Sequence, residues 1–359
     1  MQILGSKTRF AHLTYKQALL VTACSTVFLL SCLASLSGAR PFVAKRTEQS
    51  DAKMYRRVVN RVQAGGDYYD ALGSELRLGG YPMRSVFNWR TPLLLNAIAF
   101  LTEPLARILL AVLAAAAIGM ASAATGRAGG EGGVQLIVTA LALVECFAFP
   151  YDFHLFSEVW AGVLVILSIT AYAFGWWPLG VVSGILALFV RELVVPYVLV
   201  SLAIAFLRQR RAELACWIGG SALWAAYFLV HAHLVRLHMT SSDIGSVDWV
   251  QFGGLRFLMA TTRMSLLAVL PEWVSAVALA ATLLGVAGWT TGIGRRVAAV
   301  VVMYMAVFCV VGRPVNFYWG AISNPLLAFG LVWFLPAMRD LARALRRSPE
   351  PISEREPPR

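Results

Sequence analysis

The sequence predicts an all-α protein: a polytopic bundle of about ten transmembrane helices, with two juxtamembrane helices in its first external loop. Of its 359 residues, 58% are hydrophobic and only 14% are charged, whereas soluble domains carry about 25% charged residues. The net charge of +12 comes from basic residues, mostly arginines, at the ends of apolar runs. That distribution is typical of membrane orientation and gives no reason to expect a nucleic-acid partner.

Windows of about 20 apolar residues predict the spans. They lie near 17–37, 104–124, 134–150, 156–175, 214–235, 272–292, 298–312 and 319–336. The first run is longer than the roughly 7 to 15 residues of a signal-peptide core, so we expect it to be retained as a span. The five cysteines lie singly in or beside apolar runs, which indicates neither a disulfide framework nor a zinc site.

Residues 179–207 form one apolar stretch that is interrupted by Arg191 and Glu192. The stretch could be a single long helix or a hairpin that turns at this pair. A hairpin gives ten spans and places both termini and the arginine clusters after residues 207, 294 and 338 in the cytoplasm; a single helix places those clusters outside. The positive-inside rule therefore favours the hairpin. We further expect an interfacial helix over 91–101 and a re-entrant or surface helix over 254–271.

The long polar segment 38–91 is the predicted external loop, within an integral membrane domain over 1–347 that precedes a disordered cytoplasmic tail, 348–359. One amphipathic helix begins at Ser50-Asp51 and ends at Gly65-Gly66. Asp67 is placed to be the N-cap of a second helix, which ends at Gly79-Gly80. The apolar faces of the two helices are formed by Met54, Val58 and Val62, and by Tyr69, Leu72 and Leu76.

The sequence has no hydrolase, metalloprotease, dinucleotide-binding or phosphate-loop motif. Carboxylates and arginines instead gather on the predicted external face. A carboxylate at a loop-to-helix junction could be a general base toward a hydroxyl, while arginines at the membrane surface could hold a phosphate. Asp67 is the candidate catalytic base. Helix capping alone also explains an aspartate at this position, and one residue can serve both purposes.

Further polar residues on the same face are candidates for substrate binding, each with a plainer explanation. Asp70 suits the helix dipole; Tyr69 could stack on a sugar or simply be an interfacial tyrosine. His154 and Glu158 are four residues apart and follow Asp152, so they could present ligands to a metal, or form a solvated helix end. Glu158, inside the first turn of its span, calls for a partner such as Arg191.

Arg191 and Glu192 are neighbours whose side chains should point in different directions, so we do not expect them merely to pair with each other. Ionisable residues at membrane depth are candidates for function. The segment with Arg313, Asn316 and Tyr318 could contact a phosphate donor, or be an aromatic belt with one basic anchor. Glu145, deep in the third span, could make a buried interhelical hydrogen bond or have a functional role.

The combination resembles the GT-C superfamily of polytopic glycosyltransferases, which use polyprenyl-phosphate sugars. A first span is followed by a long external loop with two helices and the acidic segment Gly66-Asp67-Tyr68-Tyr69-Asp70. Later segments, Arg191-Glu192-Leu-Val-Val-Pro196 and Asn316-Phe-Tyr-Trp319-Gly320 with Pro325 beyond, are similar to members of bacterial branches of the family.

The resemblance implies an inverting transfer from a polyprenyl-phosphate-sugar donor to a hydroxyl of a glycan or lipid acceptor. Asp67 would take the proton, and Arg191 and Arg313 would stabilise the departing phosphate. It also implies a site on the external face of the plasma (inner) membrane. Asp-Tyr-Tyr-Asp stands where metal-using relatives have Asp-x-Asp or paired acids, so a divalent metal stays an open alternative.

Two other functions remain open from the sequence. A secondary transporter would place ions at mid-bilayer and would have little need for the long external loop. A polysaccharide polymerase or ligase would use the same lipid-phosphate chemistry, usually with its site in a loop late in the chain. A purely structural assembly subunit is a further alternative.

Overall fold

The computed structural model describes residues 7–36, 51–129, 137, 152–246 and 248–347. These residues form helices joined by turns, with one isolated antiparallel bridge between Val250 and Val311. The predicted all-helical class is therefore confirmed for the described part of the chain. The first described residues lie against the last helix, because the Thr8 amide donates to Asp340 Oδ2 at 2.8 Å.

Six helices among the described residues are long and apolar enough to cross a membrane. They are α1 (Tyr15–Leu36), α5 (Glu103–Gly129), α7 (Ser157–Ala171, continued by η5, Tyr172–Phe174), α10 (Arg211–His238), α13 (Gly292–Val310) and α14 (Gly320–Leu345, preceded by η8, Pro314–Trp319). Shorter apolar helices accompany them: α8 (Trp177–Val190), α9 (Val195–Leu207) and α12 (Glu272–Gly288). These helices indicate a membrane-embedded protein. The span expected at 134–150, with Glu145, lies outside the described residues, so about ten spans stays a prediction.

The apolar stretch 179–207 is a pair of helices that turns at Arg191. Helix α8 ends there because Arg191 is extended, with φ −152° and ψ 119°, and η6 (Glu192–Val194) leads into α9. A Cβ added to Gly184 would lie 3.0 Å from Cε1 of Tyr197, although a continuous helix would separate these residues by about 20 Å. The hairpin expected from the arginine distribution is the arrangement found.

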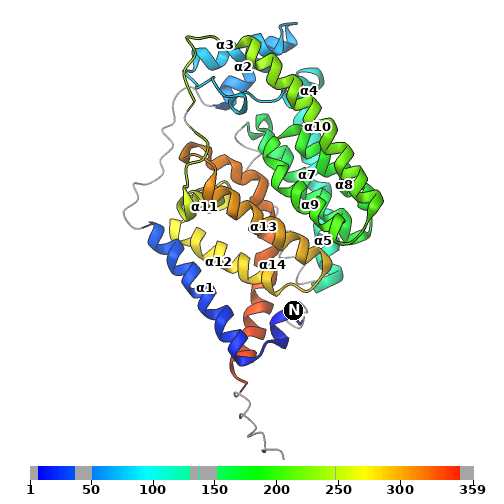
Figure 1. The fold of residues 1–359 in the computed structure, drawn as a ribbon, viewed down its shortest axis with the longest axis vertical. Helices are drawn as coiled ribbons and strands as arrows, with labels where there is room; N and C mark the ends of the chain where they lie inside the picture. Colours follow the sequence, from blue (N-terminus) through cyan, green and yellow to red (C-terminus); the bar gives the residue numbers. More distant parts are fainter. Residues whose placement is uncertain (1–6, 37–50, 130–136, 138–151, 247, 348–359) are drawn as a thin grey trace, which may run out of the picture.

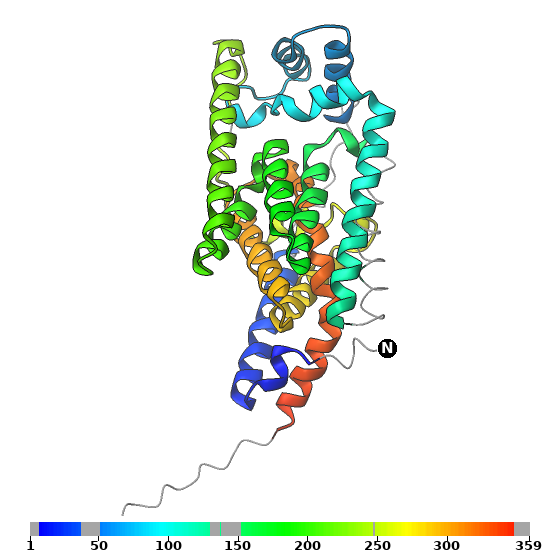
Figure 2. The same cartoon turned by 90° about the vertical axis from the view of Figure 1, so that its right-hand side faces the viewer.

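Three helices lie across one end of the bundle: α2 (Asp51–Gln63), α3 (Tyr68–Leu78) and α4 (Pro92–Leu101), with η3 (Val86–Asn88) before α4. Figures 1 and 2 show α2 and α3 covering the end at which α10 finishes and α5 begins. The predicted apolar faces are buried, apart from Val62, which is half-buried. Helix α4 occupies the range predicted for an interfacial helix.

The other end and the middle of the bundle are held by α12, α13 and α14. Glycines let the helices approach closely: a Cβ on Gly285 would overlap the carbonyl oxygen of Gly330, and one on Gly162 would overlap that of Ala321. Small residues serve the same purpose in other membrane bundles, where packing drives association. Trp289 stacks on Phe329, with ring centroids 5.9 Å apart. These contacts fix the frame beneath α2 and α3.

The remaining described elements are short: η2 (Arg9–His12), η4 (Phe153–Leu155), α11 (Gly254–Thr262) and η7 (Leu266–Val269). The sequence predicted a re-entrant or surface helix over 254–271. Helix α11 buries Phe257, Leu258 and Met259 in the core, and its end is held by Asn324, whose Nδ2 donates to the Thr261 carbonyl at 3.0 Å. It is thus packed within the protein rather than lying on its surface.

Candidate functional site

Asp67 lies where two helices meet and has the predicted capping role. Helix α2 ends because Gly65 adopts φ +89°, a conformation that favours glycine. The next helix begins with Asp67 as N-cap, and its Oδ1 accepts from the amides of Tyr69 and Asp70 at 2.7 and 3.1 Å. The side chain is exposed, and no described residue donates a hydrogen bond to Oδ2. Capping therefore occupies one carboxylate oxygen and leaves the other open.

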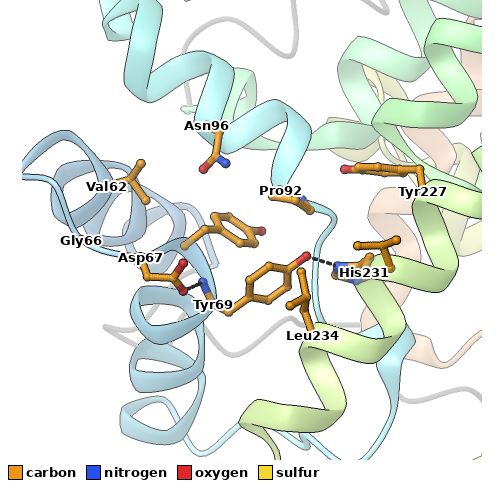
Figure 3. A pocket seen from close by; sticks show the side chains of 11 residues that line it. Val62, Gly66, Asp67, Tyr69, Pro92, Asn96, Tyr227, His231 and Leu234 are labelled. Carbon is orange, nitrogen blue, oxygen red and sulfur yellow. Dashed lines mark hydrogen bonds between the residues drawn. The ribbon is translucent and has the colours of Figure 1, made fainter.

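A pocket of about 390 Å³ opens beside Asp67, between α3, α4 and α10 (Figure 3). Its volume lies in the range of about 300–1,000 Å³ that is common for small-molecule sites. The lining combines polar and apolar side chains. The polar lining residues are Asp67, Tyr68, Tyr69, Asn96, Tyr227 and His231, and the apolar walls include Val62, Pro92, Val230 and Leu234.

Tyr69 forms part of the pocket wall and is tied to α10. Its hydroxyl lies 3.0 Å from His231 Nδ1 (Figure 3), and its ring stacks on His238 with a centroid distance of 5.5 Å. Burial raises the pKa of Tyr69, so the phenol stays protonated and forms this hydrogen bond with the imidazole as a neutral hydroxyl. The sequence predicted that Tyr69 could bind a sugar, and that role stays a prediction. In the structure Tyr69 already holds α3 against α10.

A buried ion cluster lies at the start of α7. Glu158 is completely buried, and its Oε1 lies 2.8 Å from Arg191 Nε and 3.2 Å from Arg90 Nη2. Arg191 also pairs with Glu192. The expected partner of Glu158 is thus confirmed, and Arg191 contacts both carboxylates rather than its neighbour alone. The two guanidiniums and two carboxylates balance in charge.

The same cluster extends to the segment before α14 and to the pocket wall. Arg90 Nη2 donates to the Tyr318 hydroxyl at 3.2 Å, which also accepts from Asn316 Nδ2 at 3.2 Å. The Tyr68 hydroxyl donates to the Arg90 carbonyl at 2.8 Å. The Arg313 amide donates to Asn316 Oδ1 at 3.2 Å, but its guanidinium points elsewhere and lies over the Trp249 ring at 4.4 Å. One hydrogen-bonded network therefore joins Arg90 and Tyr318, far apart in the sequence, to Tyr68 in the pocket wall.

His154 and Glu158 do not share a site. His154 is 4% exposed, and its Nε2 lies 3.0 Å from Glu103 Oε1, whereas Glu158 faces Arg90 and Arg191. The solvated helix end expected for His154 is therefore wrong: η4 (Phe153–Leu155) is packed against the start of α5. Burial and the nearby Arg107 guanidinium lower the pKa of His154, so the ring is neutral near pH 7.

Two groups of carboxylate and imidazole side chains among the described residues could hold a metal ion. In Glu103, Asp152 and His154, the carboxylates already bind Arg56 and Arg107 at 2.6–3.0 Å, so guanidinium groups take the place of a cation. The second group is Asp67, Asp70 and His238, with His238 Nε2 3.4 Å from Asp70 Oδ1. Two carboxylates and an imidazole suit a divalent ion. This second group fits a metal better.

Sequence reasoning missed two residues that organise the site, Arg90 and His231. Arg90 was unremarkable as one arginine among many, and its partners lie far along the chain. His231 follows Tyr227 by four residues, which places both side chains on one face of α10. That spacing was the available signal for a polar wall within an apolar helix.

Comparison of the chain with protein-family models, curated proteins and solved structures found no match.

Proposed function

We propose that the protein is a membrane glycosyltransferase that moves a sugar from a polyprenyl-phosphate donor to a hydroxyl group of an acceptor, with Asp67 as general base. One observation carries the proposal: a carboxylate with a free oxygen lies at the mouth of a pocket that a membrane helix, α10, bounds. The capping hydrogen bonds orient the carboxylate without occupying Oδ2. A general base needs this fixed position with one oxygen open to the substrate.

The walls beside the pocket suit a lipid-linked donor. Val230 on α10 is 59% exposed, and Phe100 on α4 is 87% exposed. Apolar side chains on both elements would contact the prenyl chain where it leaves the pocket for the bilayer. The sugar would then lie among Asn96, Tyr227 and His231, which offer hydrogen-bonding groups.

The transfer is a single displacement in this proposal. The acceptor oxygen attacks the anomeric carbon while its proton passes to Asp67 Oδ2. The bond between that carbon and the phosphate oxygen breaks, its electron pair stays on the lipid phosphate, and the configuration inverts. Arg191 is buried between two carboxylates, so we assign it to positioning the pocket wall rather than to direct contact with the phosphate.

The arrangement of the termini supports an external site. Figure 1 shows the start of α1 and the end of α14 at the end of the bundle opposite α3, and Thr8, shortly before α1, donates to Asp340 of α14. Arginines at the start of α10, the start of α13 and the end of α14 lie toward that side as well. The positive-inside rule then puts the termini in the cytoplasm and the pocket on the external face of the plasma membrane.

Replacement of Asp67 tests the proposed base. Asparagine caps helices about as well as aspartate does, so Asp67→Asn should fold normally while transfer falls by about 10²- to 10⁴-fold. The measurement is mass spectrometry of surface glycans and lipid-linked sugars in a deletion strain that expresses each variant. Asp248→Asn, an exposed carboxylate in the loop after α10, is the matched control.

Two outcomes would contradict the proposal. Full restoration of the glycan profile by Asp67→Asn would remove Asp67 as the base. A profile that does not change when the gene is deleted would remove glycosyl transfer altogether.

A chelator tests the metal alternative. An ion held by Asp67, Asp70 and His238 would neutralise the departing phosphate. We then expect EDTA to abolish transfer and Mg²⁺ or Mn²⁺ to restore it, with Asp70→Asn and His238→Gln each requiring more metal for half-maximal activity. Activity that persists in EDTA for the wild type would show that the two carboxylates act without an ion.

A further inference from the structure

A second cavity, of about 300 Å³, lies at the end of the bundle far from Asp67. It forms where α5 and α9 end and α13 begins, and Figure 1 shows these three ends meeting opposite α2 and α3. Four arginines line it: Arg127, Arg208, Arg210 and Arg296. Four guanidinium groups around one cavity repel one another, so their clustering calls for a ligand or a partner of opposite charge.

The positive charge of this cavity is only partly balanced. Glu213 is buried beside it and pairs with Arg210 at 3.3 Å and with Arg296 at 3.5 Å. Within the described part of the chain, Arg127 and Arg208 form no ion pair. Among the described residues, four arginines against one carboxylate give the cavity a net charge of about +3 at ordinary pH, because arginine stays protonated.

Neighbouring contacts fix the cavity wall in place. Arg296 is 5% exposed; its Nη1 donates to Ser201 Oγ at 3.1 Å, and its guanidinium lies 3.6 Å from the centre of the Tyr172 ring. Arg127 lies over the Phe174 ring at 4.3 Å. These contacts hold two guanidiniums in position before any ligand arrives, which lowers the entropy lost on binding.

The N-terminus of α13 adds to the positive electrostatic potential of the cavity. Thr291 caps this 19-residue helix by accepting from the Gly294 amide at 3.2 Å. A Cβ added to Gly292 would lie 3.9 Å from Arg208 Nη2, which places that guanidinium beside the helix start. Partial desolvation and the nearby Arg210 and Arg295 lower the pKa of Arg208. An anion here would relieve repulsion among the arginines and face the positive end of the helix dipole.

We propose that this arginine cavity binds a phosphate group, at the end of the bundle opposite Asp67. Guanidinium forks match phosphate oxygens in geometry and form charge-assisted hydrogen bonds with them. The phosphate could belong to an anionic lipid headgroup or to a soluble compound. The site is separate from the proposed glycosyl transfer, since none of its residues lines the pocket at Asp67.

Thermal unfolding of the full chain in a neutral detergent tests the proposal. The probes are inorganic pyrophosphate and phosphatidylglycerol in mixed micelles, each compared at equal ionic strength with sodium chloride or phosphatidylcholine. A ligand that binds the folded state raises the unfolding midpoint as its concentration rises. We expect this rise for the wild type, and an affinity about tenfold weaker in Arg208→Gln and in Arg127→Gln.

Arg211→Gln is the matched control, because Arg211 is an exposed neighbour in sequence that does not line the cavity. A response to pyrophosphate assigns the site to soluble phosphates, and a response to phosphatidylglycerol alone assigns it to a lipid headgroup; both support a phosphate site. The proposal is overturned if neither probe raises the midpoint, or if Arg211→Gln weakens binding as much as Arg208→Gln does.

Discussion

The two ends of the helix bundle use arginine in opposite ways. At the end covered by α2 and α3, Arg90 and Arg191 are buried against Glu158 and Glu192 and form a neutral cluster. At the other end, Arg127 and Arg208 line a cavity without a carboxylate partner among the described residues. Paired arginines support a rigid wall, whereas unpaired ones leave charge available for a ligand. Burial explains the difference, since a buried charge without a partner is costly.

The largest expected effect comes from breaking the neutral cluster. Glu158→Gln would leave two buried guanidiniums without their shared carboxylate, so we expect the free energy of unfolding to fall by about 3–5 kcal/mol. The measurement is thermal or denaturant unfolding of the purified chain in detergent. Asp248→Asn, which is exposed, should change stability little. Equal unfolding free energies for the two variants would show that the ion cluster does not stabilise the end of the bundle covered by α2 and α3.

A smaller loss of stability is expected when the ion pair between Arg77 of α3 and Asp243, in the loop after α10, is removed. Arg77 Nε donates to Asp243 Oδ1 at 2.8 Å, and this bond lowers the pKa of Asp243 to about 2. The folded state thus binds the proton less readily than the unfolded state, and the contribution is present above about pH 4 and lost toward pH 2. We expect about 1 kcal/mol, because Arg77 is partly exposed.

Asp243→Asn checks this pH dependence. The variant should lose stability at pH 7 and approach the wild type as the pH falls toward 2. Parallel pH profiles for the two proteins would assign the acid response to other carboxylates at this end.

The smallest change in stability is expected at the arginine cavity, where most of the arginines are exposed and have few carboxylate partners. Without a ligand, Arg208→Gln should change the free energy of unfolding by no more than about 0.5 kcal/mol, because no described carboxylate loses a partner. The same unfolding measurement checks it, with Arg211→Gln alongside. A loss as large as that of Glu158→Gln would mean that Arg208 is structural, and the contrast between the ends would disappear.

The sequence was most informative where a structure is determined within a few residues. The Gly65-Gly66-Asp67 helix junction follows from backbone preferences and capping, which act locally. The hairpin at Arg191 followed from arginine distribution, and the pairing of Glu158 with Arg191 followed from the cost of an ionised group in a membrane. Each prediction needed only a local rule or a strong energetic constraint.

Contacts set by packing could not be predicted in this way. Arg90 and Tyr318 are 228 positions apart, and nothing near either residue signals the other. His154 and Glu158 are close in sequence but separate, because η4 turns the histidine toward α5 while Glu158 enters α7. The role of Asp67 as a base, the donor and the acceptor stay predictions that the proposed experiments test.

The position of Arg90 in the chain has a consequence for membrane insertion. The ribosome synthesises Arg90 first, then Glu158 and then Arg191, so one of the two cationic partners of Glu158 exists before α8 and α9 are made. That carboxylate need not enter the bilayer unpaired while the hairpin is still missing. Arg191, at the turn between α8 and α9, completes the cluster by pairing with Glu158. Docking of these two short helices is thereby coupled to an ion pair with α7.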